Sequence, residues 1–167
     1  MSRPGAKITV REHVHVARPR DEVFDYTQDY GRRSEWDNSV TAAEILSESP
    51  RRIRITVRGL GSFTVAYQLF HPPERTSAAF VDVDSRWMSG GGGSWRYEPV
   101  DRGTDWTQTN TLELQAGWQR FLAWLVESSL RSNMRRSMAE AKRRLETAAR
   151  SPAAGGSPAA APGGSSD

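Results

Sequence analysis

Residues 118–148, WQRFLAWLVESSLRSNMRRSMAEAKRRLETA, form the longest helical pattern in a chain otherwise made of short alternating runs. At about 100° per residue, Met134, Met138, Ala141 and Leu145 fall on one stripe, while most of the basic residues take the other side. This spacing predicts a long amphipathic helix with one buried face.

The first half of this helix is apolar on nearly all sides. Trp118, Phe121, Leu122 and Leu125 lie about half a turn away from the stripe of the second half. Two interpretations fit this change of phase. Either the helix breaks near residues 128–129, or its first half has apolar contacts on two sides, with the core on one and a ligand, partner or lipid surface on the other.

Upstream of the helix, hydrophobic and polar residues alternate in segments separated by turn-like residues. Such alternation is typical of strands with one buried face. Short links between successive strands predict an antiparallel meander. The expected strands are residues 8–17, 40–46, 52–58, 62–70, 77–84, 94–100 and 104–114.

Two short helices are expected between the first two strands. Segment 17–29, ARPRDEVFDYTQD, has a proline and acidic residues suited to a helix start, and residues 32–36 supply a second helical piece. Asp29, Glu35 and Asp37 lie around this second piece. Acids at helix ends usually act as caps, although these three could also serve as an acid or base.

The run Gly90–Gly93 cannot hold a regular strand without an entropic cost. It indicates either a sharp bend in a curved sheet or a mobile loop at the mouth of a cavity. The sequence does not decide whether this run gates a cavity.

The composition favours a single domain at residues 7–148, preceded by a disordered start at 1–6 and followed by a disordered Ala/Gly/Pro/Ser tail at 149–167. No signal-peptide pattern and no membrane-spanning run is found, so we expect a soluble, cytoplasmic protein. The basic residues are scattered among acids, which argues against a nucleic-acid partner. With no cysteine and no metal-ligand spacing, we expect neither a metal nor a cofactor.

Several polar side chains are expected on the inward faces of the strands. Alternation places Tyr67, Trp95 and Tyr97 inward, and it puts Gln108 and Asn110 among apolar residues of the last strand. Buried amides are costly without hydrogen-bond partners. They therefore bond to neighbours in a solid core, or they orient a ligand in a hollow one. The six tryptophans provide more aromatic surface than a compact core needs, which is compatible with a cavity.

Three segments carry a resemblance to a known superfamily. They are VARPRDEVFDYTQD at 16–29 followed by Trp36 and Val40, WRYEPVDRGTDW at 95–106, and AKRRLE at 141–146. Together with the order of elements, they resemble the SRPBCC superfamily, which includes START-related lipid-transfer proteins, polyketide cyclases and dehydrases, and pollen-allergen-like binders. The resemblance covers about residues 7 to 148.

The resemblance implies an α+β helix-grip fold, in which a seven-stranded antiparallel sheet wraps round the long C-terminal helix and leaves an elongated apolar cavity. The specific Arg, Ser or Tyr groups that aromatase/cyclases of the superfamily place in the pocket are not matched by motif. The residues that would face or rim the cavity are Trp36, Tyr67, Trp95, Tyr97, Gln108, Asn110, Trp118, Leu122 and Val126.

Three functions follow as hypotheses. The first is binding of a hydrophobic small molecule such as a lipid, polyketide or isoprenoid. The second is an enzyme of the polyketide cyclase/dehydrase type that uses the same cavity. The third is an interaction module that makes a homodimer or a peripheral membrane contact through Trp118, Phe121 and Leu125. Binding is favoured over catalysis because no group with an evidently tuned pKa stands out.

Overall fold

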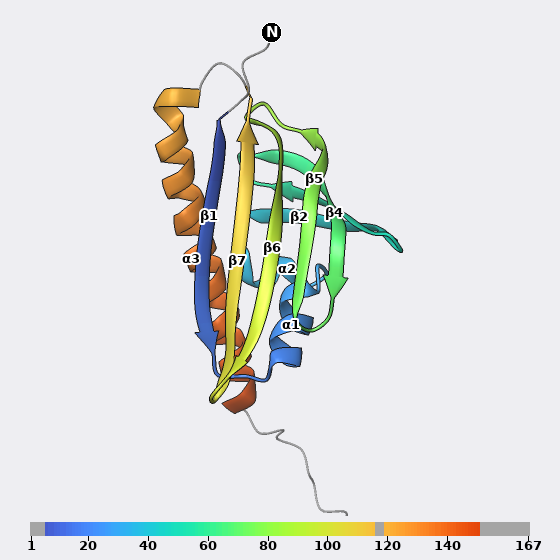
Figure 1. Cartoon of the computed structure of the whole chain (residues 1–167), viewed down its shortest axis with the longest axis vertical. Coiled ribbons are helices and arrows are strands. Elements are labelled where there is room, and N and C mark those ends of the chain that lie inside the picture. Colours follow the sequence, from blue (N-terminus) through green and yellow to red (C-terminus); the bar gives the residue numbers. More distant parts are fainter. Residues whose placement is uncertain (1–5, 116–118, 151–167) are drawn as a thin grey trace, which may run out of the picture.

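The computed structural model of the chain describes residues 6–115 and 119–150. One curved antiparallel sheet dominates these residues, and the long helix α3 runs beside β1 and passes behind the sheet (Figure 1). The elements are β1 Lys7–Val16, α1 Arg20–Gln28, α2 Arg33–Trp36, β2 Val40–Glu48, β3 Arg51–Val57, β4 Gly61–His71, β5 Arg75–Asp84, β6 Met88–Val100, β7 Gly103–Leu114 and α3 Gln119–Arg150.

The seven strands are arranged in the order β1-β7-β6-β5-β4-β3-β2. From β2 onward each strand pairs with the next, while β1 pairs antiparallel with the last strand, from Lys7 opposite Glu113 to Val16 opposite Thr104. This topology, with two short helices after β1 and a long C-terminal helix, confirms the predicted helix-grip fold. It leaves β1 and β2 as the two edges of the sheet.

Helix α3 is continuous from Gln119 to Arg150, so the first of the two interpretations of its change of phase, a break near residues 128–129, is wrong. Its second half buries the predicted stripe, with Met134, Met138 and Ala141 at 3% exposure or less. The sheet therefore covers one face of the helix, as the apolar spacing requires.

Glu12 is a charged residue on the otherwise apolar face of β1, and its contacts with α3 account for its position. Its carboxylate accepts hydrogen bonds from Arg131 Nη1 at 2.7 Å and Arg135 Nε at 2.8 Å, and its side chain is only 11% exposed. These charge-assisted bonds tie the edge strand to α3.

The glycine run belongs to a paired strand. Strand β6 begins at Met88 rather than near residue 94, and Gly90–Gly93 pairs with β7, so the mobile-loop interpretation is wrong. The ladder is irregular where it shifts register between Met88 and Gly90. Gly91 has a φ of +153°, and a Cβ on it would lie 2.2 Å from the carbonyl oxygen of Thr111. Glycine is therefore required for the close approach of β6 to β7 at this point.

Three aromatic rings form the centre of the core. Trp36 meets Trp106 edge to face at 5.7 Å between ring centroids, and Tyr97 stacks on Trp106 at 6.2 Å. All three residues are at most 1% exposed. This cluster packs α2 against strands β6 and β7.

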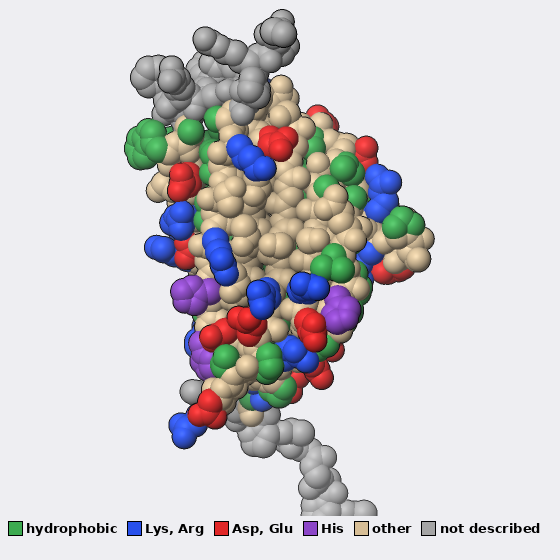
Figure 2. All heavy atoms as spheres, in the orientation of Figure 1, with side chains coloured by type: hydrophobic (Ala, Val, Ile, Leu, Met, Phe, Trp, Pro, Cys, Tyr) green, Lys and Arg blue, Asp and Glu red, His purple; other side chains and the backbone are tan. Residues whose placement is uncertain are grey.

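The outer face of the sheet carries few hydrophobic side chains (Figure 2). Charged and histidine side chains gather over its lower half, and uncharged groups cover much of the rest. Within residues 6–115 and 119–150, no helix has the length and apolar content needed to span a lipid bilayer.

Candidate functional site

A cavity of about 630 Å³ lies between the inner face of the sheet and α3. Its lining mixes aliphatic and aromatic side chains with polar ones from the sheet, from the segment after α2 and from α3. It includes Tyr30, Arg33, Asp37, Ser39, Phe63, Trp95, Gln108, Asn110, Val126, Leu130 and Asn133.

Helix α3 presents two adjacent rows of side chains to the cavity. Val126, Leu130 and Met134 lie four residues apart and face the sheet, and Met134 is buried. Ser129 and Asn133 also line the cavity and form a neighbouring row, because residues i and i+4 share a helix face. The helix therefore supplies an apolar wall with a polar border.

Trp95, Gln108 and Asn110 form the floor on the sheet side. Trp95 lies directly opposite Gln108 in the β6–β7 ladder, and Gly93 lies opposite Asn110. Gln108 is only 4% exposed, and its Nε2 donates a long hydrogen bond of 3.5 Å to Asn110 Oδ1. Trp95 Nε1 is buried and has no hydrogen-bond partner among the described residues. The floor thus offers hydrogen-bonding capacity that its neighbours use poorly.

Gly93 makes room for this floor. A Cβ on Gly93 would lie 2.7 Å from Trp95 Cη2 and 3.1 Å from Asn110 Oδ1. The run of glycines therefore lets two larger side chains lie over the strand, which is one reason for small residues inside β6.

A buried ion pair forms part of the wall. Arg33 Nη2 donates to Asp37 Oδ2 at 3.0 Å, and both side chains are less than 10% exposed. The guanidinium also lies over the ring of Trp36, with Cζ 4.2 Å from the ring centroid, and faces Tyr30 at 5.6 Å. Stacking and pairing together hold this cation in a fixed orientation.

Asp37 is saturated with donors. Its Oδ1 accepts from Ser39 N at 3.2 Å, Ser39 Oγ at 2.6 Å and Ser137 Oγ at 3.3 Å. Burial acts to raise the pKa of the Asp37 carboxyl, but the Arg33 guanidinium and the Ser39 hydrogen bonds outweigh it and hold that pKa below its usual range. Asp37 is therefore a structural carboxylate. It also ends α2 as its C-cap residue, because its backbone N–H donates to Arg33 O at 2.9 Å.

Four of the residues that the sequence predicted for the site lie in the lining of this cavity. They are Trp95, Gln108, Asn110 and Val126. The strand members among them were located by alternation, since residues i and i+2 share a face of a sheet.

Three other predicted residues lie elsewhere. Trp36 is in the core and borders a second cavity of about 550 Å³ between α2 and α3. Tyr97 directs its hydroxyl toward α1, where Gln28 Nε2 donates to it at 2.8 Å and Thr27 Oγ1 lies at 2.7 Å. Tyr67 likewise donates to Gln28 Oε1 at 2.7 Å. Burial raises the pKa of both tyrosines, so both hydroxyls stay protonated and structural.

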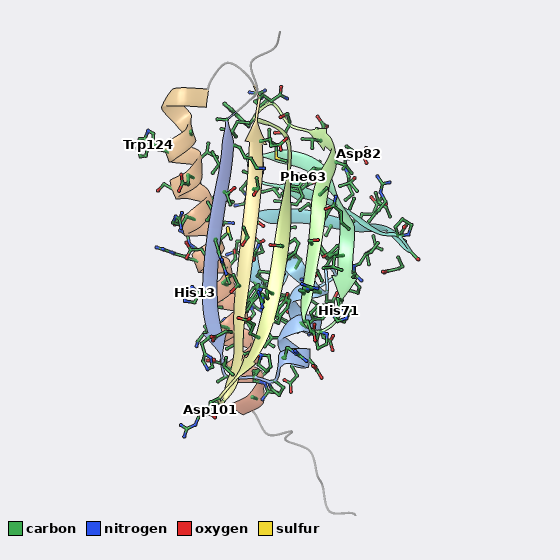
Figure 3. All side chains as sticks on the ribbon, viewed as in Figure 1. His13, Phe63, His71, Asp82, Asp101 and Trp124 are labelled. Carbon is green, nitrogen blue, oxygen red and sulfur yellow. The ribbon has the colours of Figure 1, made fainter. Side chains whose placement is uncertain are left out.

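The remaining predicted residues cannot be placed. Trp118 and the side chains of Phe121 and Leu122 lie outside the described residues. Next to them in the chain, Leu125 lines the cavity and is 49% exposed, and Trp124 is 66% exposed. Trp124 points away from the sheet (Figure 3).

Sequence reasoning missed the polar residues that the α2 segment and α3 bring together: Arg33, Ser39, Asn133 and Ser137. Asn133 Nδ2 donates to Ser39 Oγ at 3.1 Å across the gap between these elements. Ser39 and Asn133 are 94 positions apart in the chain, and no local sequence pattern indicates that they are in contact. Only Asp37, an acid just after a helical pattern, carried a signal in the sequence.

The fold and the cavity together define a helix-grip protein of the START/SRPBCC class. The chain belongs to the polyketide cyclase / dehydrase and lipid transport family, whose family model matches residues 7–146. A comparison with curated proteins gave no match.

Solved structures of the same fold include an aromatase/cyclase, a di-domain ARO/CYC protein and a START superfamily protein. The Zhui aromatase/cyclase from Streptomyces sp. R1128 is 20% identical with a TM-score of 0.75, covering 91% of this chain and 100% of its own. The di-domain ARO/CYC BexL from the BE-7585A biosynthetic pathway is 18% identical with a TM-score of 0.69, covering 84% of this chain and 50% of its own. A START superfamily protein from Mycobacterium smegmatis is 14% identical with a TM-score of 0.70, covering 84% and 98% of the two chains. At these identities the likeness shows the fold alone.

Proposed function

We propose that this protein binds a hydrophobic small molecule that carries a few carbonyl or hydroxyl groups, such as a polyketide or a lipid, in the cavity between the sheet and α3. One observation supports this most strongly. The cavity floor places Trp95 Nε1, Gln108 and Asn110, whose hydrogen-bonding capacity is poorly used, among aliphatic and aromatic walls. A ligand with polar atoms at matching positions would satisfy these groups.

The size of the cavity fits this proposal. Its volume of about 630 Å³ lies within the range of about 300–1,000 Å³ that is usual for small-molecule sites. Val126 and Leu130 on one side and Phe63 and Val65 on the other would bury the apolar body of the ligand. Membership of a polyketide cyclase / dehydrase and lipid transport family supports the same class of ligand.

Binding is preferred to catalysis because Asp37, the one acid among the described residues that line the cavity, is already engaged. Asp37 accepts hydrogen bonds from Arg33, Ser39 and Ser137, which makes it a weak base. None of the described residues that line the cavity is a histidine. General acid–base chemistry in this cavity would therefore lack an obvious proton acceptor.

Calorimetric titration with 1-decanol and with 2-naphthol tests the proposal. The wild-type protein is expected to bind at least one of these probes, and Val126→Trp, which fills the cavity, is expected to bind neither. Ser132→Trp is the matched control, since Ser132 is exposed on the same helix and does not line the cavity. Circular dichroism checks that both variants remain folded. Equal binding by wild type and Val126→Trp would contradict the proposal.

A second candidate function is ring closure or dehydration of a polyketide chain. It is favoured by the cluster of Trp95, Gln108 and Asn110, since donors aimed at a carbonyl oxygen can stabilise developing enolate charge. Turnover of a linear poly-β-ketone that is lost in Gln108→Leu and Asn110→Leu, while 1-decanol still binds, would support catalysis. Turnover that survives both substitutions would count against it.

A further inference from the structure

Basic residues outnumber acidic ones among the described residues that line the cavity. Three arginines, Arg33, Arg58 and Arg136, lie among the described lining residues, against the single acid Asp37. Arg33 and Asp37 neutralise each other at 3.0 Å. Arg58 and Arg136 remain, and within residues 6–115 and 119–150 neither guanidinium has an ion pair or a side-chain hydrogen bond. An apolar cavity lined by two uncompensated cations favours an anion.

The two free arginines lie on opposite sides of one polar segment. The backbone N–H of Arg58 donates to Ser39 O at 2.8 Å, and Asn133 Nδ2 donates to Ser39 Oγ at 3.1 Å. Arg136 lies three residues after Asn133 on α3, and so comes from the same side of the helix. Asn38, next to Ser39, also lines the cavity. The end of β3 and the middle of α3 thus flank one polar stretch of the rim with a cation on each side.

The rim is apolar further along. Leu60, Trp87 and Leu125 all line the cavity, and the three are exposed or only partly buried. Ser85 joins the first two, because its hydroxyl donates to Leu60 O and accepts from Trp87 N at 3.1 Å. The rim is therefore amphipathic, with a cationic stretch and an apolar stretch, which suits a ligand with one charged end.

Arg136 also lines a second cavity, in which the other arginines form ion pairs. This cavity, of about 550 Å³, shares Asn38, Asn133, Arg136 and Ser137 with the first. Its other arginines are occupied, since Arg143 and Arg144 donate to the Glu140 carboxylate at 2.6 and 2.7 Å. Arg136 stands at the junction of the two cavities without such a partner among the described residues.

We propose that the ligand of the cavity carries an acidic end group, a carboxylate or a phosphate, which is held at the rim between Arg58 and Arg136. This inference rests on the proposed function and names the chemical class of its ligand. The planar guanidinium fork pairs with either oxyanion through two parallel N–H···O bonds. Asn38 and Asn133 add neutral amide groups beside the same position. The apolar body of the ligand then extends along Val126 and Leu130 toward the floor.

Affinities for a matched pair of probes test the inference: sodium decanoate and 1-decanol at pH 7.5, which share a chain and differ in charge. The wild type is expected to bind decanoate roughly three- to tenfold more tightly than 1-decanol, since charge-assisted bonds to exposed arginines are worth that much. The preference should decline as salt is raised, because exposed charges are screened. Decyl phosphate is the third probe, and its affinity relative to decanoate identifies the preferred acid.

Arg58→Gln and Arg136→Gln are expected to remove most of the preference for decanoate and to leave the affinity for 1-decanol unchanged. Arg11→Gln is the matched control, because Arg11 is exposed on β1 and does not line the cavity. It loses the same charge and should bind decanoate as the wild type does. Thermal unfolding of all three variants should match the wild type, since each residue is exposed.

Three results would overturn the inference. One is equal affinity of the wild type for decanoate and 1-decanol. Another is a preference for decanoate that survives both cavity substitutions, or that falls equally in Arg11→Gln. The last is binding of neither decanoate nor 1-decanol, and if 2-naphthol does not bind either, the proposed function is overturned as well. Binding of 1-decanol without a preference for the acid leaves the proposed function standing and refutes only the acidic end group.

Discussion

Arg33 and Asp37 lie one helical turn apart, and their side chains form an ion pair of 3.0 Å inside the wall of the cavity. The pair is buried, and its remaining bonds go to Ser39, Ser137 and the face of Trp36. It joins α2, the start of β2 and α3 at the point where the sheet and the long helix face each other. The shape of the cavity therefore depends on this pair.

Breaking the pair should destabilise the protein strongly. Arg33→Met leaves the Asp37 carboxylate buried without its cation, and we expect a loss of about 3–5 kcal/mol in the free energy of unfolding. Urea denaturation measures it. Arg52→Gln is the control. Both side chains of the Arg52–Asp82 pair are exposed, so this pair should contribute less than about 1 kcal/mol to stability. Equal effects of the two substitutions would refute the structural role of the buried pair.

The same pair predicts a pH dependence of stability. The pKa of Asp37 is held below its ordinary value of 3.8, so the folded protein binds the proton less readily than the unfolded chain. The stabilisation by Asp37 is therefore complete above that value and is lost as the pH falls through the lower folded-state pKa. The stability difference between wild type and Asp37→Asn should be constant from pH 7 to 5 and shrink below about pH 3.8. A difference that grows on acidification would contradict the assignment.

Gly91 should not tolerate a side chain. Gly91→Ala places a Cβ 2.2 Å from Thr111 O at a positive φ, and we expect a loss of about 2 kcal/mol or more. Gly59→Ala is a matched control, since Gly59 also has a positive φ, +74°, but a Cβ there would meet nothing within 4 Å. It should cost about 1 kcal/mol, from backbone strain alone. Similar losses for the two variants would mean that β6 and β7 are not closely apposed at Gly91.

Glu12 should link the edge strand to α3. Glu12→Gln weakens the bonds to Arg131 and Arg135, and we expect a loss of about 1–2 kcal/mol, moderated by the exposure of the arginines. Glu98→Gln removes an exposed partner of Arg96 and should change stability by less than about 0.5 kcal/mol. Hydrogen exchange of the β1 amides gives an independent measurement, and unchanged protection in Glu12→Gln would count against the link.

Much of the fold could be predicted from local patterns. Period-two alternation located the strands, and the 3.6-residue stripe of Met134, Met138 and Ala141 located the buried face of α3, because burial on one face imposes a period on the sequence. Gly90–Gly93 was harder. The need for glycine there comes from the carbonyl of Thr111 on the neighbouring strand, which no local pattern reveals.

The site was predictable only in part, and for a related reason. Gln108 and Asn110 stand out as amides on an apolar strand face, and Trp95 shares that environment. Arg33 and Asn133 resemble ordinary polar helix residues in the sequence. They become part of a site only because α2 and α3, which are far apart in the chain, meet beside the cavity.

The most direct test of the central claim is the indole N–H resonance of Trp95 in a ¹H–¹⁵N spectrum during titration with 1-decanol. Trp95 lines the cavity, and its Nε1 has no hydrogen-bond partner among the described residues. Trp106, by contrast, is buried in the core outside the cavity lining, and Trp124 points to solvent. A ligand in the cavity should shift the Trp95 resonance in a saturable manner and leave the Trp106 and Trp124 resonances nearly unchanged. Shifts confined to Trp124, or no shift of Trp95 at any concentration of the probe, would contradict the account.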